Sequence, residues 1–148
     1  MKDTNRSPKY SRIASGLVVV SLLSVGCGED KPSPAAAEKT VIAETGVKGI
    51  KTVTLSALGL QRIDLKTSKV AQGTGGKEIP YSAVIYAPDG ATWTFVSTAA
   101  ARTFQRSAIA IERIDGEIAY LSDGPDVGAD VVSQGAAQLY GAEFGLGH

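Results

Sequence analysis

Turn signals divide the second half of this chain into short extended runs, and they constrain its fold more than any other feature. Pro88-Asp89-Gly90 stands between a β-rich run at 78–86 and an alternating run at 92–96. Asp115-Gly116 separates the run at 103–114 from the one at 117–121. Such residues between β-rich runs are typical of tight turns, and Asp-Gly is typical of two-residue hairpin loops. The pattern therefore predicts two β-hairpins between residues 78 and 121.

The remaining runs extend this pattern on both sides. Extended runs occupy 49–55 and 63–70, and a further short strand begins at Val131-Val132. Ser56 is placed to cap a short helix at 57–62, and residues 136–140 favour a last helical turn. Many short strands at regular spacing are typical of barrels and sandwiches. The sequence predicts a mainly β fold, a small β-barrel or sandwich-like domain with one or two short helices.

The first 26 residues have the organisation of an export signal. A basic segment precedes 14 residues, 13–26, that carry no charge. As a helix this run would be about 21 Å long, which is shorter than the ~30 Å hydrocarbon core of a bilayer. We therefore expect a cleaved signal peptide rather than a membrane-spanning helix.

The uncharged run ends at Gly26-Cys27, where the sequence resembles the lipobox of bacterial lipoproteins. Gly26 is the small residue expected before the cysteine, whereas Leu23 lies four positions before it instead of the commonest three. The resemblance implies signal cleavage between Gly26 and Cys27 and attachment of acyl chains to the Cys27 thiol. Two or more acyl chains anchor a protein stably. The alternative is an ordinary export signal that ends at a cysteine by chance.

These features predict three parts of the chain. Residues 1–26 form the lipoprotein signal peptide, and residues 27–40 form the lipidated cysteine and a flexible tether rich in proline, alanine and charge. Residues 41–148 form the β-domain, which is long enough for one small core. We expect the protein at the cell membrane, anchored by lipid on the extracytoplasmic side.

The charge balance argues against a nucleic-acid partner. Four of the 15 basic residues and one of the 15 acidic residues precede Cys27, so the mature part carries 11 basic and 14 acidic side chains. It contains no run of lysine or arginine, whereas neutralising phosphates requires clustered positive charge. We therefore expect no binding to nucleic acid.

The sequence lacks an obvious catalytic set. Its only histidine is the terminal His148, and a serine nucleophile of the triad type needs a positioned imidazole. Thioether ligation of copper is excluded because Met1 is the only methionine and leaves with the signal. We expect no enzyme activity, no metal and no cofactor, and a cryptic hydrolase is the weakest hypothesis.

Two further segments superficially resemble binding motifs. Gly73-Thr74-Gly75-Gly76-Lys77 lacks the first glycine and the final hydroxyl residue of a phosphate-binding loop, which favours a linker. Asp123, Asp126 and Asp130 depart from the alternating ligand spacing of an EF-hand. The glycines between them favour a solvated turn over a calcium site.

Aromatic residues on the 92–96 run have two interpretations. Trp93 and Phe95 lie two positions apart and so face the same side of a strand. The structural interpretation is that both rings pack in the core. The functional interpretation is that they form an aromatic docking face for a partner. Arg102 and Arg106, on the loop and run that follow, complete the candidate partner-binding residues.

Residues 50–141 resemble the periplasmic adaptor proteins of efflux systems, which are also called membrane fusion or hemolysin-D-like proteins. The resemblance rests on a proline-led strand, a hairpin, a strand pair, a glycine-centred loop and a terminal Gly-Ala segment. In this sequence these are Ile79–Val84, Trp93–Val96, Ile109–Ile111, Gly124–Val132 and Gly135–Leu139. The loop at Asp123–Asp130 replaces the family's usual Gly-Leu-x-x-Gly-Asp.

The resemblance implies a lipid-tethered, membrane-proximal β-domain that works beside a transporter or another envelope complex. A complete adaptor also carries a lipoyl-like domain and usually a long helical hairpin, for which 148 residues leave no room. We therefore expect an accessory component that acts by protein contacts. The alternative hypothesis is a free-standing surface lipoprotein that binds a small ligand or a cell-wall polymer.

Overall fold

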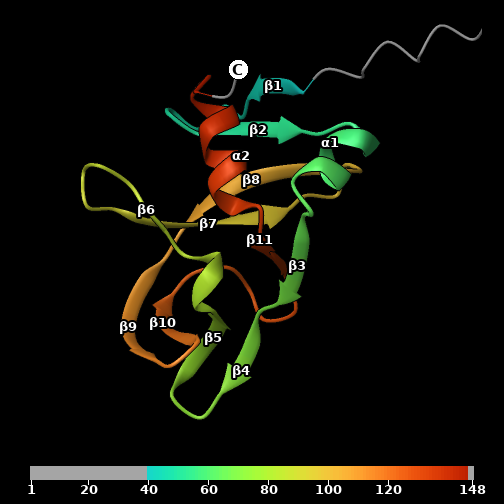
Figure 1. Cartoon of the computed structure of the whole chain (residues 1–148). Helices are drawn as coiled ribbons and strands as arrows, with labels where there is room; N and C mark the ends of the chain where they lie inside the picture. The colour runs from blue at the N-terminus through green and yellow to red at the C-terminus, as the bar shows by residue number, and fades with distance from the viewer. Residues whose placement is uncertain (1–39, 147–148) are drawn as a thin grey trace, which may run out of the picture. The chain divides into compact units, whose positions relative to one another are not determined.

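The computed structural model describes residues 40–146, which form a mainly β domain with two antiparallel sheets and two short helices (Figure 1). The sequence prediction of a small, mainly β, sandwich-like domain is confirmed. Among the described residues, no helix has the length and apolar character needed to cross a bilayer.

The first sheet, sheet A, has the strand order β1-β2-β8-β7-β11-β3, and β6 also pairs with β7. All of its pairings are antiparallel. Its strands are β1 (Val41–Glu44), β2 (Lys51–Thr54), β3 (Lys66–Lys69), β6 (Ile85–Tyr86), β7 (Thr92–Ser97), β8 (Thr103–Ala108) and β11 (Asp130–Gln134).

The second sheet, sheet B, has the order β4-β5-β10-β9 and consists of two hairpins side by side (Figure 1). Its strands are β4 (Ala71–Gly73), β5 (Gly76–Pro80), β9 (Ala110–Asp115) and β10 (Ile118–Asp123). The two-residue loop Gly116-Glu117 joins β9 to β10, one position later than the predicted Asp115-Gly116, because Asp115 pairs with Ile118; Gly116 adopts a φ of +57°. Both predicted hairpins are therefore confirmed, since β6 and β7 flank the Pro88-Asp89-Gly90 turn.

Two helices complete the domain, α1 (Ala57–Arg62) and α2 (Ala136–Glu143). The hydroxyl of Ser56 accepts a hydrogen bond from the Gly59 N–H, which confirms the predicted cap of α1. The second helix is longer than the predicted single turn at 136–140. It contacts β2 and β7 of sheet A.

Four features differ from the prediction. Strand β3 begins only at Lys66, because Ile63 caps α1 and Asp64 follows with a φ of +45°. Residues 73–77 are not a linker, since Gly73 pairs with Gly76 across a hairpin turn. The single run predicted at 103–114 divides at Ile109, where the chain leaves sheet A for sheet B. A short 3₁₀ turn, Tyr81–Ala83, also interrupts the run at 78–86.

The core has two clusters of buried side chains. The cluster under sheet A and α2 contains two phenylalanines: its members are Val53, Leu55, Phe95, Phe104, Val132, Ala136 and Leu139. The cluster at sheet B is entirely aliphatic: its members are Val70, Ile79, Ala83, Ile109, Ala119, Leu121 and Val131. Burial of this apolar surface is the main stabilising contribution to the fold.

Candidate functional site

Arg106 occupies the centre of the candidate site. It lies on β8 with 6% of its surface exposed, which is unusual for an arginine. Its Nε donates to Oε2 of Glu143 at 2.6 Å, and its Nη2 donates to the Gly49 carbonyl oxygen at 2.6 Å. A buried guanidinium requires such partners because removing a charge from water is costly.

Glu143 reaches this position because one face of α2 packs against sheet A. Its buried residues, Ala136, Leu139 and Glu143, follow the spacing of one helix face. The second carboxylate oxygen, Oε1, accepts the N–H of Lys51 at 3.1 Å. The ion pair therefore ties α2 to β8, to β2 and to the loop before β2.

Aromatic rings surround the guanidinium of Arg106. Its Cζ lies 4.5 Å from the ring centroid of Trp93, 5.0 Å from that of Phe144 and 5.7 Å from that of Tyr140. Contacts of this kind contribute about 0.5–2 kcal/mol each, and more where water is excluded. The rings come from β7 and from the C-terminal end of the described chain, so this cluster also fastens α2 to the sheet.

An open cavity of about 840 Å³ lies beside this cluster. Its walls are largely apolar and come from the β1–β2 loop, the β6–β7 turn, β7 and the C-terminal segment. They include Val47, Ile50, Pro88, Trp93, Phe144 and Leu146. Lys48, Asp89 and Arg106 add charged groups of both signs. The cavity is thus a largely apolar surface with charged groups of both signs at its margin.

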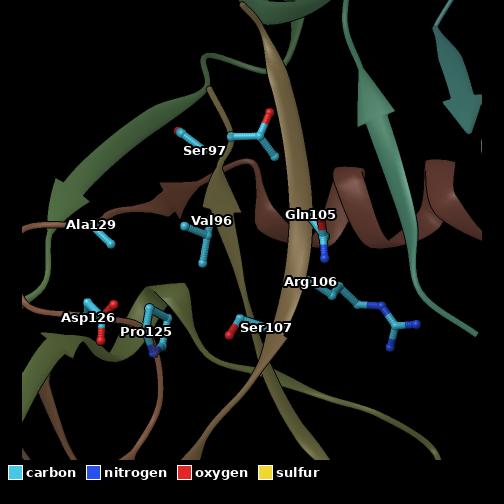
Figure 2. Close-up of a pocket in the computed structure, with 9 residues that line it drawn as sticks. Val96, Ser97, Gln105, Arg106, Ser107, Pro125, Asp126 and Ala129 are labelled. Atoms are coloured by element: carbon cyan, nitrogen blue, oxygen red, sulfur yellow. The ribbon is translucent and has the colours of Figure 1, made fainter. Parts of the chain in front are cut away.

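A second hollow, of about 340 Å³, lies on the opposite face of the β7–β8 hairpin (Figure 2). Gln105 and Ser107 line it from β8, while Pro125 and Asp126 line it from the loop before β11. In Figure 2 the side chain of Arg106 points away from the other residues of the hollow. Alternation along β8 explains this, because neighbouring residues face opposite sides of a strand.

The four candidate partner-binding residues have different environments. Trp93 and Arg106 are brought together in the aromatic cluster, and Phe95 is fully buried in the core of sheet A. Arg102 is exposed in the β7–β8 turn with a φ of +55°. Phe95 and Arg106 are therefore packing residues, which corresponds to the core interpretation of this face.

Glu143, Tyr140 and Phe144 were not among the site residues predicted from the sequence. A signal for Glu143 was present, because an acidic residue continues the apolar stripe that Ala136 and Leu139 begin. Its partner Arg106 lies 37 residues away along the chain, and no local pattern connects the two.

The three aspartates of the loop have separate interactions. Asp130 pairs with Lys69 at 2.7 Å, Asp126 lies 3.8 Å from Lys77, and the Asp123 carboxylate accepts the Gly124 N–H at 2.9 Å. Across residues 40–146, no three acidic, histidine or cysteine side chains are grouped to hold a metal ion.

Several predicted features fall outside the described residues: the signal peptide, the Gly26-Cys27 cleavage and lipidation site, the tether up to residue 39, and His148. No family model, curated protein or solved structure matches this chain.

Proposed function

We propose that this chain is a lipid-anchored extracytoplasmic protein that acts through protein contacts as an adaptor-like accessory component of an envelope transport system. The observation that carries the proposal is the ordered resemblance from Ile79 to Leu139 to the periplasmic adaptors. These residues form a continuous part of one folded domain, from β5 to α2.

The proposed anchor is supported by the N-terminal sequence. Cys27 follows a run of 14 uncharged residues and is the only cysteine of the chain. A thiol in this position is the group to which lipoproteins attach their acyl chains, and several chains suffice for stable anchoring. The folded domain begins 14 residues later, with β1 at Val41.

Exposed tyrosines provide a surface for protein contact within the resembling segment. Tyr81 and Tyr86 expose 40% and 53% of their surface. A hydrogen bond with the Tyr81 side chain raises the pKa of Tyr86, because it stabilises the protonated phenol. Tyrosine is enriched at protein interfaces, since it combines a large apolar ring with a polar tip. This pair replaces Phe95 and Arg106 as the proposed contact surface.

The anchor is tested by Cys27→Ser, with Ser33→Ala in the tether as the matched control. We expect Cys27→Ser to leave the membrane fraction and Ser33→Ala to stay in it. Intact mass spectrometry of the wild type should show a chain that begins at an acylated Cys27. An unmodified Cys27 at the N-terminus, or a retained Met1, would contradict the anchor.

The transport role is tested by photo-crosslinking in native membranes. Probes at Tyr86 and Arg102 should capture a transporter subunit, while a probe at the exposed Glu112 of β9 serves as the control position. A deletion strain should lose part of its export capacity. Recovery of peptidoglycan alone, together with unchanged export, would contradict this function.

The alternative of a ligand-binding surface lipoprotein is supported by one observation, the cavity of about 840 Å³ beside Trp93. Its size lies within the range of small-molecule sites, which is roughly 300–1,000 Å³. A saturable change in Trp93 fluorescence with soluble cell-wall fragments would favour this alternative over the transport role.

A further inference from the structure

Exposed apolar side chains gather at one end of the domain. Ile42, Val47, Phe144 and Leu146, which we call the end patch, expose 37%, 54%, 50% and 74% of their surface. Phe144 lines the large cavity together with Val47 and Leu146, and it lines a neighbouring hollow together with Ile42. The four residues therefore belong to one continuous surface. Apolar patches of this kind on a folded domain indicate a binding surface.

The groups around the end patch have the chemistry of a membrane–water interface. Aromatic rings of Trp93 and Tyr140 lie in the cavity wall next to Phe144, and Lys48 lines the same cavity. Aromatic rings and lysine stems are the side chains that place an apolar body in lipid and a polar tip in water.

The charges at the end patch are compatible with a lipid surface. The guanidinium of Arg106 is neutralised by Glu143 at 2.6 Å, and Lys51 pairs with Glu44 at 3.4 Å. Asp89 also lines the cavity, and its carboxylate accepts the Ala91 N–H at 3.0 Å. The buried guanidinium of Arg106 therefore has its counter-charge within the domain and requires none from a lipid surface.

The position of the patch relates it to the proposed anchor. Thirteen residues, 28–40, separate Cys27 from Val41. A chain of this length spans at most about 45 Å when fully extended. Ile42 of the end patch belongs to β1, the strand that follows this segment in the sequence. The first strand that follows the attachment point in the sequence thus contributes a residue to the end patch.

We propose that the end patch rests on the bilayer surface, with Val47 and Leu146 entering the boundary between headgroups and acyl chains. This inference rests on the proposed lipid anchor, which would hold the domain close enough for a weak surface contact to persist. Apolar groups at such a boundary penetrate about 5–10 Å. The contact would orient the domain on the membrane, which an acyl anchor on a long tether does not do by itself.

Trp93 provides the test, because it is the only tryptophan of the chain and lines the cavity at the patch. The lipidated protein is purified from membranes, its acylation is verified by intact mass, and it is reconstituted into phosphatidylglycerol–phosphatidylethanolamine vesicles. One set of vesicles carries acyl chains brominated close to the headgroup, which quench a nearby indole. We expect Trp93 emission to fall in the brominated vesicles relative to the plain ones.

Variants locate the contact. Leu146→Asp and Val47→Asp change exposed residues outside the core, so they should fold normally and lose the quenching. The matched control is Ile114→Asp on β9, whose residue is 43% exposed in sheet B, and it should be quenched like the wild type. Circular dichroism verifies the fold of each variant.

The outcomes separate this inference from the proposed function. An acylated protein whose Trp93 emission is equal in both kinds of vesicle would overturn the inference alone. Quenching that persists in both patch variants would overturn it too, because the contact would then lie elsewhere. A protein without acyl chains would overturn the anchor, and the inference with it.

Discussion

The two sheets are stabilised by different means. Sheet A carries the buried polar groups: among residues 40–146, the buried polar or charged side chains are Ser56, Thr94, Thr103, Arg106 and Glu143, all on its strands or on the segments that adjoin them. The cluster at sheet B is purely aliphatic. Its two hairpins depend on turns of defined geometry instead, at Thr74-Gly75 and Gly116-Glu117.

This difference shows where each half of the domain is vulnerable. A buried ion pair is sensitive to the loss of one partner, because the other charge then stays in a low-dielectric environment. A hairpin built on aliphatic packing has no such group, and its weak points are residues with a positive φ. Substitutions that change a charge should therefore destabilise sheet A most. Substitutions at residues with a positive φ should destabilise sheet B most.

The largest effect is expected at the buried pair. Glu143→Gln keeps the shape of the side chain but leaves the Arg106 guanidinium without a counter-charge. We expect the free energy of unfolding to fall by about 3 kcal/mol. The matched control is Glu44→Gln, which removes an exposed pair with Lys51 whose partners are 40% and 73% exposed, and should cost at most about 1 kcal/mol. Urea denaturation measures both.

A double variant sharpens the same comparison. Arg106→Met combined with Glu143→Leu replaces the pair by apolar groups, and it should be more stable than Glu143→Gln alone, because no uncompensated charge remains. Equal stability of Glu143→Gln and Glu44→Gln would show that sheet A does not depend on the buried pair.

Features decided by neighbouring residues could be predicted from the sequence. The loop between β9 and β10 requires a residue that tolerates positive φ, which is Gly116, and the Ser56 cap needs only the N–H of Gly59 three residues on. Both depend on local chemistry. The mainly β class follows from the repetition of such signals.

Features decided by distant parts of the chain could not be predicted. The break at Ile109 exists because its N–H bonds to the Thr92 carbonyl oxygen at 3.1 Å while the next residues join sheet B. Gly76 has a φ of +127°, and a Cβ there would lie 2.8 Å from the Leu121 carbonyl oxygen on β10. Because both features depend on strand pairing across the fold, the local sequence did not reveal them.

The candidate site was found only in part for the same reason. Trp93 and Arg106 were both among the predicted partner-binding residues, but the pairing of β7 with β8 that brings them together was not predicted. Their acidic and aromatic partners come from α2 and the residue after it, and the site is complete only when that helix packs on the sheet.

A smaller effect is expected in sheet B. Gly116→Val puts a β-branched residue at a φ of +57°, where an added Cβ meets no atom within 4 Å. The cost therefore comes from the backbone alone, and we expect about 1–2 kcal/mol. Ala110→Val, on an exposed position of β9, is the control and should be nearly neutral, because valine suits a strand. Equal melting temperatures of the two variants would contradict the role assigned to this turn.

The smallest effect is expected at an exposed polar cluster on the edge of sheet A. The carboxylate of Asp64 accepts hydrogen bonds from Lys66 at 3.1 Å and from Gln134 at 2.7 Å, and these bonds lower its pKa below the ordinary value of 3.8. A group with a lowered pKa stabilises the fold at a pH above the pKa that it has in the unfolded chain. This contribution to stability is lost as the pH falls through the pKa that it has in the folded protein. Asp64 is exposed to solvent, so its contribution to stability should be small.

Carboxyl ¹³C NMR titration isolates this group from the rest of sheet A. Lys66→Met should raise the pKa of Asp64 toward 3.8, because it removes the first cause of the shift. Lys69→Met on the same strand removes only a pair with Asp130 and should leave the Asp64 titration unchanged. If Lys66→Met leaves that pKa where it was, the hydrogen bond is not its cause. Lys66→Met removes an exposed pair, so it should lower the free energy of unfolding much less than Glu143→Gln does. If the two variants lower it equally, burial is not what makes the Arg106–Glu143 pair important for stability.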